Sequence, residues 1–190
     1  SIKEISGCKF TDITTPSGPV YYIKTVAEIL FYNNIFENTN HPNTDSRPGI
    51  MYANYNGRLN VINCKFIRIV GKSPNGHIIN SNGGNTGQLK FEECEFIDCG
   101  NPGNMPLITV LNKASTINFN KCNFTYTKKE YSCMIVGVIS NSATFEGCNF
   151  IECGEDCIFL GYTNNESPGA AEPEGTFIFT NNHIKGTQGR

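Results

Sequence analysis

Tryptophan is absent from this 190-residue sequence, and charged residues are scarce. Asp, Glu, Lys and Arg make up 17% of it, whereas about a quarter is usual in soluble domains. The formal net charge is −2 and no stretch is basic enough to follow a phosphate backbone, so we expect no nucleic-acid partner. No run of about 18 apolar residues occurs, so no segment is expected to span a membrane as a helix.

The residues that are abundant favour β-structure. The sequence has 13 Phe and 8 Tyr, which supply aromatic bulk, and 19 Gly together with many Asn, which suit tight corners. The length is that of one domain, and it is sufficient to bury a hydrophobic core.

A short pattern recurs seven times along the chain. An apolar residue is followed three positions later by Cys or Asn, here called the anchor, and two positions after that by Phe or Ile. The anchors are Cys8, Asn34, Cys64, Cys94, Cys122, Cys148 and Asn182. Successive anchors are 26 to 34 residues apart, so the unit is constant while its connections vary.

Each repeat contains a second strand signal and a corner signal. Short apolar runs precede the later anchors and read as strands; they begin at Pro19, Gly49, His77, Pro106, Cys133 and Cys157. Five of the seven residues just before an anchor are Gly or Asn, which readily adopt left-handed backbone angles. A bend there lets the anchor and the apolar residue three positions earlier both face inward, which one unbroken strand forbids.

These repeats predict an all-β protein, a right-handed parallel β-helix (a pectin-lyase-like solenoid) of about seven coils. Residues 1–190 are expected to form one such domain, as a fragment of a longer solenoid, because no amphipathic helix covers either terminal repeat. Further β-helix, a capping segment or oligomeric stacking would then cover the ends. The alternative is a leucine-rich repeat, faintly echoed by LKFEECEF at 89–96, but its period is shorter and dominated by Leu.

Two stretches give a family resemblance. FYNN at 31–34 and FTNN at 179–182 match one half of the polymorphic-membrane-protein repeat of chlamydial autotransporter passengers, and GIMYA at 49–53 is similar to the other half. The chain departs from that pattern at its Cys anchors and at Gly83-Gly84, which is off register. The resemblance implies a repeat-rich β-helix that is secreted or exposed on a cell surface as an adhesin.

The five anchor cysteines should share one column with the two anchor asparagines. We interpret this column as a buried packing ladder in which Asn side chains bond to their neighbours and Cys fills the same small slot. Cys94 with Cys99, and Cys148 with Cys153, have a C-x4-C spacing that does not fit a compact zinc site, so no metal is expected. Of the disulfide pairings, Cys133 with Cys157 is the most suitable, since these residues occupy equivalent positions in neighbouring coils. The cysteine pattern leaves open whether the protein resides in an oxidising or a reducing compartment.

An enzyme is a weaker interpretation. PNTD at 42–45 is similar to the Asn-Thr-Asp of polygalacturonases, and NGH at 75–77 and Asp156 could be its partners. Their order differs from that family, and Asp45 and Asp156 fall about four coils apart, roughly 19 Å, too far for paired carboxylates. We therefore predict no catalytic residue and no cofactor.

Exposed aromatic and amide residues near the apolar runs form a candidate ligand face: Tyr52, Asn54, Tyr55, Asn80, Asn82 and Tyr162. The variable insertions are expected mainly at one corner, after the short strand that follows the anchor, where solenoids often carry a binding face. Asn123 and Asn165 lie in Asn-x-Ser/Thr sequons and are candidate glycosylation sites, with Asn123 outward between two inward residues.

Three functions remain for the chain. The first is a non-catalytic adhesin-type binding module, secreted or at the cell surface, that binds a protein or glycan on a host or neighbouring cell. The alternative is a structural scaffold rod held in a larger intracellular assembly. The second alternative is a polysaccharide-active, pectinase-like enzyme.

Overall fold

The fold was obtained as a computed structural model, and it is described here for thirteen stretches of the chain. These are residues 2–15, 20–25, 28–42, 50–55, 57–71, 78–81, 87–100, 108–110, 116–125, 136–138, 142–153, 158–160 and 176–186. The residues in these stretches form 22 β-strands and no helix. Within them, no helix is long and apolar enough to cross a membrane.

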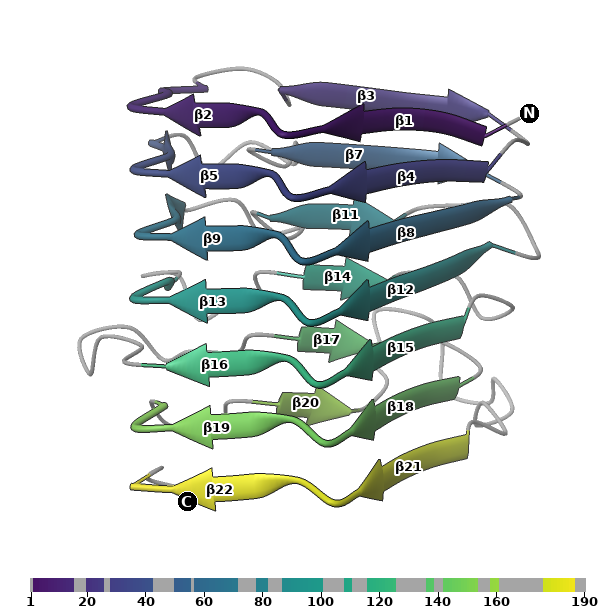
Figure 1. Ribbon diagram of the computed structural model, residues 1–190, viewed down its shortest axis with the longest axis vertical. Coiled ribbons are helices and arrows are strands. Elements are labelled where there is room, and N and C mark those ends of the chain that lie inside the picture. Colours follow the sequence, from purple (N-terminus) through teal and green to yellow (C-terminus); the bar gives the residue numbers. More distant parts are fainter. Residues whose placement is uncertain are drawn as a thin grey trace, which may run out of the picture.

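Three parallel sheets run the length of the molecule, and each takes one strand from successive repeats (Figure 1). The first sheet contains β1 (Ile2–Ser6), β4 (Glu28–Tyr32), β8 (Arg58–Ile62), β12 (Gln88–Glu92), β15 (Thr116–Asn120), β18 (Ser142–Glu146) and β21 (Thr176–Thr180). The second contains β2 (Lys9–Thr11), β5 (Ile35–Glu37), β9 (Lys65–Ile67), β13 (Glu95–Ile97), β16 (Asn123–Thr125), β19 (Asn149–Ile151) and β22 (His183–Lys185).

The third sheet lies behind the other two in Figure 1. It contains β3 (Tyr21–Thr25), β7 (Met51–Tyr55), β11 (Ile79–Ser81), β14 (Ile108–Val110), β17 (Val136–Val138) and β20 (Ile158–Leu160). A small fourth sheet pairs β6 (Asn40–His41) with β10 (Val70–Gly71). The prediction of an all-β, parallel-stranded repeat protein is confirmed, and the arrangement is compatible with a parallel β-helix. A leucine-rich repeat would supply one strand per repeat, not three.

Equivalent residues of successive repeats pair directly. Phe31 in β4 is the register partner of Val61 in β8, which is in turn the partner of Phe91 in β12. Because the register is kept from repeat to repeat, side chains of one repeat position lie above one another as a column.

The predicted bend before the anchor is present in every repeat. All seven residues there have positive φ, between 51° and 64°. They include Glu93 and Lys121, whose side chains give no local signal for this conformation. As a result, the anchor Cys94 and the earlier apolar residue Phe91 are both buried, as expected.

A second left-handed corner, four residues after the anchor, was missed by the sequence analysis. It is formed by Asp12, Asn38, Arg68, Asp98, Glu152 and Gly186, with φ between 50° and 66°. The next side chain turns back into the core: Thr39, Ile69, Cys99 and Cys153 are all buried. The residues that follow this corner therefore form a second interior column.

Aromatic columns fill the interior. Two positions after the anchor, Phe10, Phe36, Phe66, Phe96, Phe124 and Phe150 stack with ring centroids 4.7 to 5.3 Å apart and planes within 10°. Three positions before the anchor, Phe91, Phe119, Phe145 and Phe179 stack at 4.8 to 5.0 Å. The columns meet edge to face, as where Phe119 contacts Phe124 at 5.8 Å. Each such pair adds about 0.5–1.5 kcal/mol beyond its buried area.

Phe124 is the most informative residue for testing this core. Its ring is fully buried and stacks at 4.7 Å on Phe96 and at 4.9 Å on Phe150. We expect Phe124→Ala to lower the free energy of unfolding by about 3–5 kcal/mol, and Phe124→Asp to prevent folding by burying an unpaired charge. Urea unfolding followed by circular dichroism measures both. The exposed Asn118→Asp is the control, and a Phe124→Asp variant as stable as that control would contradict the core assignment.

Candidate functional site

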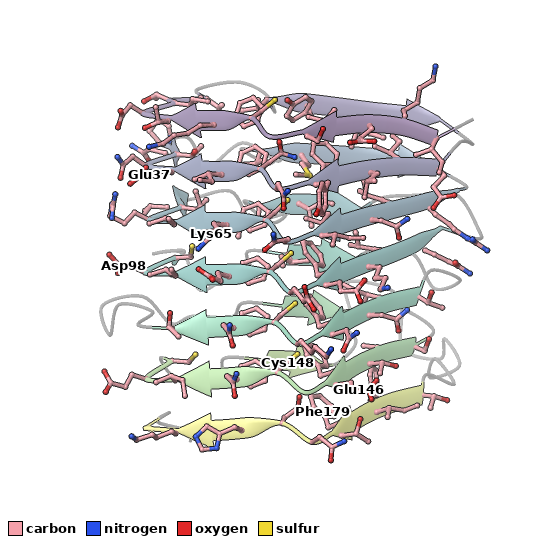
Figure 2. All side chains as sticks on the ribbon, viewed as in Figure 1. Glu37, Lys65, Asp98, Glu146, Cys148 and Phe179 are labelled. Atoms are coloured by element: carbon pink, nitrogen blue, oxygen red, sulfur yellow. The ribbon has the colours of Figure 1, made fainter. Side chains whose placement is uncertain are left out.

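The anchor column lies at the corner between the first and second sheets. Cys64, Cys94, Cys122 and Cys148 are completely buried there, whereas Cys8 in the first repeat is exposed. Figure 2 labels Cys148 where the ribbon passes from β18 to β19. The seven cysteines in the described ranges carry thiols, not disulfides. The interpretation of the anchors as a buried packing column is confirmed.

The anchor asparagines join one repeat to the preceding one through its main chain. Asn34 donates from Nδ2 to the Ile5 carbonyl (2.7 Å) and accepts at Oδ1 from the Cys8 N–H (2.9 Å). Asn182 likewise donates to the Phe145 carbonyl at 2.9 Å and accepts from the Cys148 N–H at 2.8 Å. The amides were predicted to bond to neighbouring side chains, whereas these four bonds join them to main-chain atoms.

The cysteines reproduce the donor half of this arrangement. The Cys94 sulfur lies 3.3 Å from the Val61 carbonyl oxygen and 3.4 Å from that of Glu92. The Cys64 sulfur lies 3.6 Å from the Phe31 carbonyl oxygen and 3.4 Å from that of Ile62, so each single S–H can donate to one of two carbonyls at a time. The Phe31 and Val61 carbonyls occupy the repeat position that Asn34 reaches in the preceding repeat. Cys and Asn therefore share the column because both are small and both can donate to the same main-chain oxygen.

This environment raises the pKa of Cys64 and Cys122 and lowers the pKa of Cys148. Burial raises the pKa of Cys64 to about 11, although the Asn34 N–H beside it favours the thiolate. Burial also raises the pKa of Cys122, while the hydrogen bond from Cys122 lowers the pKa of Cys148, so a proton lost by this pair leaves Cys148 first. A cysteine nucleophile needs a lowered pKa together with access to solvent. Cys148 has the lowered pKa but is completely buried, and Cys64 and Cys122 have neither the lowered pKa nor access to solvent, so no thiol among these three meets both requirements.

No three His, Cys, Asp or Glu side chains come together as a metal site in the described stretches. Cys133 and Cys157, for which a disulfide was predicted, lie outside those stretches. So do Asp45, His77 and Asp156, the residues of the pectinase-like interpretation.

Polar side chains on the outer face of the second sheet pair from repeat to repeat. Lys9 contacts Glu37 at 3.1 Å, and Arg68 contacts both Glu37 and Asn38. Asn38 donates to Asp12 at 2.9 Å. The bond from Asn38 lowers the pKa of Asp12, and the bond from Lys9 lowers that of Glu37. Glu37 and Asp98 are labelled on this side of the molecule in Figure 2.

Asn123 lies on the same outer face, half-buried between two buried residues, as predicted. Its Oδ1 accepts a hydrogen bond from Nδ2 of Asn149 at 2.7 Å. A glycan would be attached to Nδ2 of Asn123. That atom belongs to the same side-chain amide that the hydrogen bond from Asn149 holds in place. Asn165, the second sequon residue, lies outside the described stretches.

The candidate ligand face maps mainly to the third sheet. Tyr52, Asn54 and Tyr55 are in β7, and Asn80 is in β11. Register pairing places Tyr52 and Asn80 next to each other on adjacent strands, whereas Asn54 and Tyr55 pair toward β3 instead. Asn82 and Tyr162 lie outside the described stretches. The register of the third sheet therefore places Tyr52 beside Asn80. It does not test whether the six residues of the candidate ligand face come together.

Comparison with known proteins gives no match: no family model, no curated protein and no solved structure is detectably similar to this chain. The resemblance to the polymorphic-membrane-protein repeat therefore has no support from a family match.

Substitutions at the anchor column test its main-chain bonds. Asn34→Ala leaves a buried carbonyl and a main-chain N–H without their partner, so we expect the free energy of unfolding to fall by about 1–3 kcal/mol. Asn34→Cys should lose less, because a thiol can donate to the same carbonyl. Cys122→Asn should be tolerated, since Asn already fills two positions of the column. Denaturant unfolding compares the three variants, and Cys122→Asn proving the most damaging would refute the shared-slot explanation.

The raised pKa of Cys64 predicts loss of stability in alkali. The folded protein holds this proton up to a pKa of about 11, while the ordinary value is 9.0. Its contribution is therefore complete below pH 9 and is lost as the pH rises through 11. The matched variant Cys64→Ser keeps a small hydrogen-bond donor that does not titrate in this range. Its free energy of unfolding, measured from pH 8 to pH 11, should fall less steeply than that of the wild type by about 2 kcal/mol. Parallel curves would show that the thiol is not buried.

Proposed function

We propose that this chain is a non-catalytic, right-handed parallel β-helix of about seven coils that acts as a binding module, secreted or exposed on a cell surface. The parallel sheets support this handedness, because connections between parallel strands of one sheet are right-handed in about 98% of cases. The path in Figure 1 supports it: the strands of the third sheet return behind those of the first and second before the next repeat begins.

The binding role is supported by the lengths of the connections between the sheets. These lengths are constant at one corner of the repeat and variable at the other two. In every repeat two residues connect the first sheet to the second, as at 33–34 and 147–148. Between the second and third sheets the connection ranges from 6 residues (152–157) to 13 (38–50). The connection back to the first sheet varies as well and is longest at 161–175. Variation was expected mainly at the first of these corners, and it occurs at both.

A rigid core with variable connections suits recognition. The in-register sheets and stacked aromatic columns fix the points where each connecting segment leaves and re-enters the molecule. The ends of connections that differ in length and sequence are thereby held at regular intervals, and solenoids with such connections often build extended binding surfaces from them. The pair Tyr52 and Asn80 lies on the sheet between the two variable corners. A protein or a glycan on a host or neighbouring cell is the partner that this surface would bind.

The chemistry of the described acidic residues supports a non-catalytic role. A glycosidase needs one carboxyl group whose pKa is raised so that it can donate a proton. The acids whose pKa shifts on the outer face, Asp12 and Glu37, shift downward because they accept hydrogen bonds. They are thus held as carboxylates that stabilise the ladder between repeats.

The buried thiols favour a second candidate, a structural rod inside a cell. Cys64, Cys94, Cys122 and Cys148 follow one another in a single column as thiols. Oxidising compartments usually convert closely spaced cysteines to disulfides, whereas the cytosol keeps them reduced. In this second candidate, the partner would be other components of an assembly that hold the rod along its sides.

A binding assay separates these candidates. We expect the chain to bind saturably to a printed glycan array or to cultured epithelial cells. Tyr52→Ala and Asn80→Ala should each weaken binding about tenfold, because a truncated central contact typically costs 1–2 kcal/mol. Asn118→Ala, on the outer face of the first sheet, is the matched control. Surface plasmon resonance against the glycan or cell-surface protein identified gives the affinities.

The other outcomes are equally informative. Saturable binding that Tyr52→Ala leaves unchanged would move the ligand face elsewhere on the rod. No saturable binding to glycans or cells would overturn the binding module and favour the scaffold. Release of reducing ends from polygalacturonic acid would overturn the non-catalytic role.

A further inference from the structure

The anchor column contains an unbroken run of thiols from four successive repeats. All of them are completely buried: Cys64, Cys94, Cys122 and Cys148. The main chain at these anchors keeps the register of the sheets on either side, because Asn123 donates from its N–H to the Cys94 carbonyl and Asn149 to the Cys122 carbonyl, both at 2.9 Å. Successive anchors are therefore separated by the strand spacing of a sheet, roughly 4.8 Å.

The four sulfur atoms also point in the same direction. Each lies near the carbonyl oxygen two residues earlier in its own repeat, at 3.4 Å for Cys64 and Cys94, 3.5 Å for Cys122 and 3.6 Å for Cys148. Side chains of equal orientation on strands in register keep the spacing of the strands. Neighbouring sulfurs are therefore also roughly 4.8 Å apart.

This separation does not suit a disulfide. The S–S bond is about 2.05 Å long, and the Cβ atoms that it joins are about 3.5–4.5 Å apart. Parallel side chains in register keep their Cβ atoms at roughly 4.8 Å. Closing the bond would require the corner to move, although hydrogen bonds at 2.9 Å hold its main chain. Adjacent thiols of the column are thus held close together without being joined.

The same separation suits an ion that takes two sulfur ligands in a line. A zinc–thiolate bond is about 2.3 Å long, so a linear sulfur–metal–sulfur unit with bonds of similar length spans about 4.6 Å. Thiolates select soft ions such as Cu(I), whose filled d shell permits linear coordination by two ligands. Zinc is unsuitable because it takes four ligands, and no three metal-binding side chains come together in the described stretches.

We propose that Cu(I) binds between Cys122 and Cys148, bonded to both sulfur atoms. These two thiols already interact across the junction through a hydrogen bond, and Figure 2 labels Cys148 at this corner. When the ion binds, the S–H proton of Cys148 leaves to solvent and no electron is transferred. One monovalent ion, one thiolate and one thiol make an uncharged site, which a completely buried position requires.

This site would be loaded as the corner folds, because both of its thiols are completely buried in the folded chain. Metal binding and folding are coupled at sites of this kind. The proposal concerns the core of the molecule and does not depend on the ligand face or on the absence of catalysis. It differs from the zinc site that the cysteine spacing excludes, since it needs only two ligands from adjacent repeats.

Refolding with the ion tests the site. The reduced protein is refolded without oxygen in the presence of Cu(I), and loosely held ions are removed with bathocuproine disulfonate. We expect the wild type to retain about one more copper ion per chain than Cys122→Asn. X-ray absorption at the copper edge should show two sulfur ligands for this ion. Circular dichroism verifies that each variant folds, which is expected because Asn already fills two positions of the column.

Two further variants locate the ion. Cys64→Asn makes the same substitution in the same column outside the site, so it is the matched control and should retain as much copper as the wild type. Cys148→Asn should lose the ion, and it decides the question if Cys122→Asn does not fold. Copper held equally by the wild type and all variants would indicate adventitious binding at other thiols, such as the exposed Cys8, and would overturn the proposal. Equal loss in Cys64→Asn, or full retention in Cys148→Asn, would overturn it as well.

Discussion

The residue immediately before each anchor determines where the rest of the repeat lies. Its left-handed conformation, with φ between 51° and 64° in all seven repeats, interrupts the alternation of the strand. Without it, side chains three positions apart would point to opposite faces, and either Phe91 or Cys94 would be exposed. Because the bend turns both inward, each repeat can bury two sets of residues around one corner. The columns, the sheets and their register all depend on this corner.

The same bend explains why the anchor is small and able to form hydrogen bonds. It brings the anchor side chain against the main chain of the preceding repeat, where a carbonyl points toward it. Asn34 satisfies that carbonyl and an N–H together, while Cys94 satisfies the carbonyl with its thiol. A larger apolar residue would leave the carbonyl without a donor and would not fit between stacked rings. The repeated cysteines thus serve main-chain hydrogen bonding inside a corner.

The parallel strands, the anchor column and the first bend could be predicted from the sequence. Each local signal is weak, but the same signal recurs at one position in several repeats. Glu93 and Lys121 have no intrinsic preference for left-handed angles, and only their alignment with Gly7 and Asn33 reveals the bend. The second corner was not predicted: Asp12, Asn38, Asp98 and Gly186 are of types that favour left-handed angles, but Arg68 and Glu152 are not, and the buried residues that follow are as different as Thr39, Ile69 and Cys99. The amide partners of Asn34 were also missed, since a repeat pattern gives the column but not the atoms that meet in it.

The interior columns are not uniform, and this bears on how the rod responds to load. In a solenoid each repeat contacts only its neighbours, so cohesion is a local property of each junction. The column that precedes the anchors is aromatic and continuous from Phe91 to Phe179, but Val61 separates this stretch from Phe31. The repeats around Val61 are joined without ring stacking on that side of the core. Val61 leaves two successive junctions, to Phe31 and to Phe91, without ring stacking in this column, so bending and separation under load are expected to concentrate there.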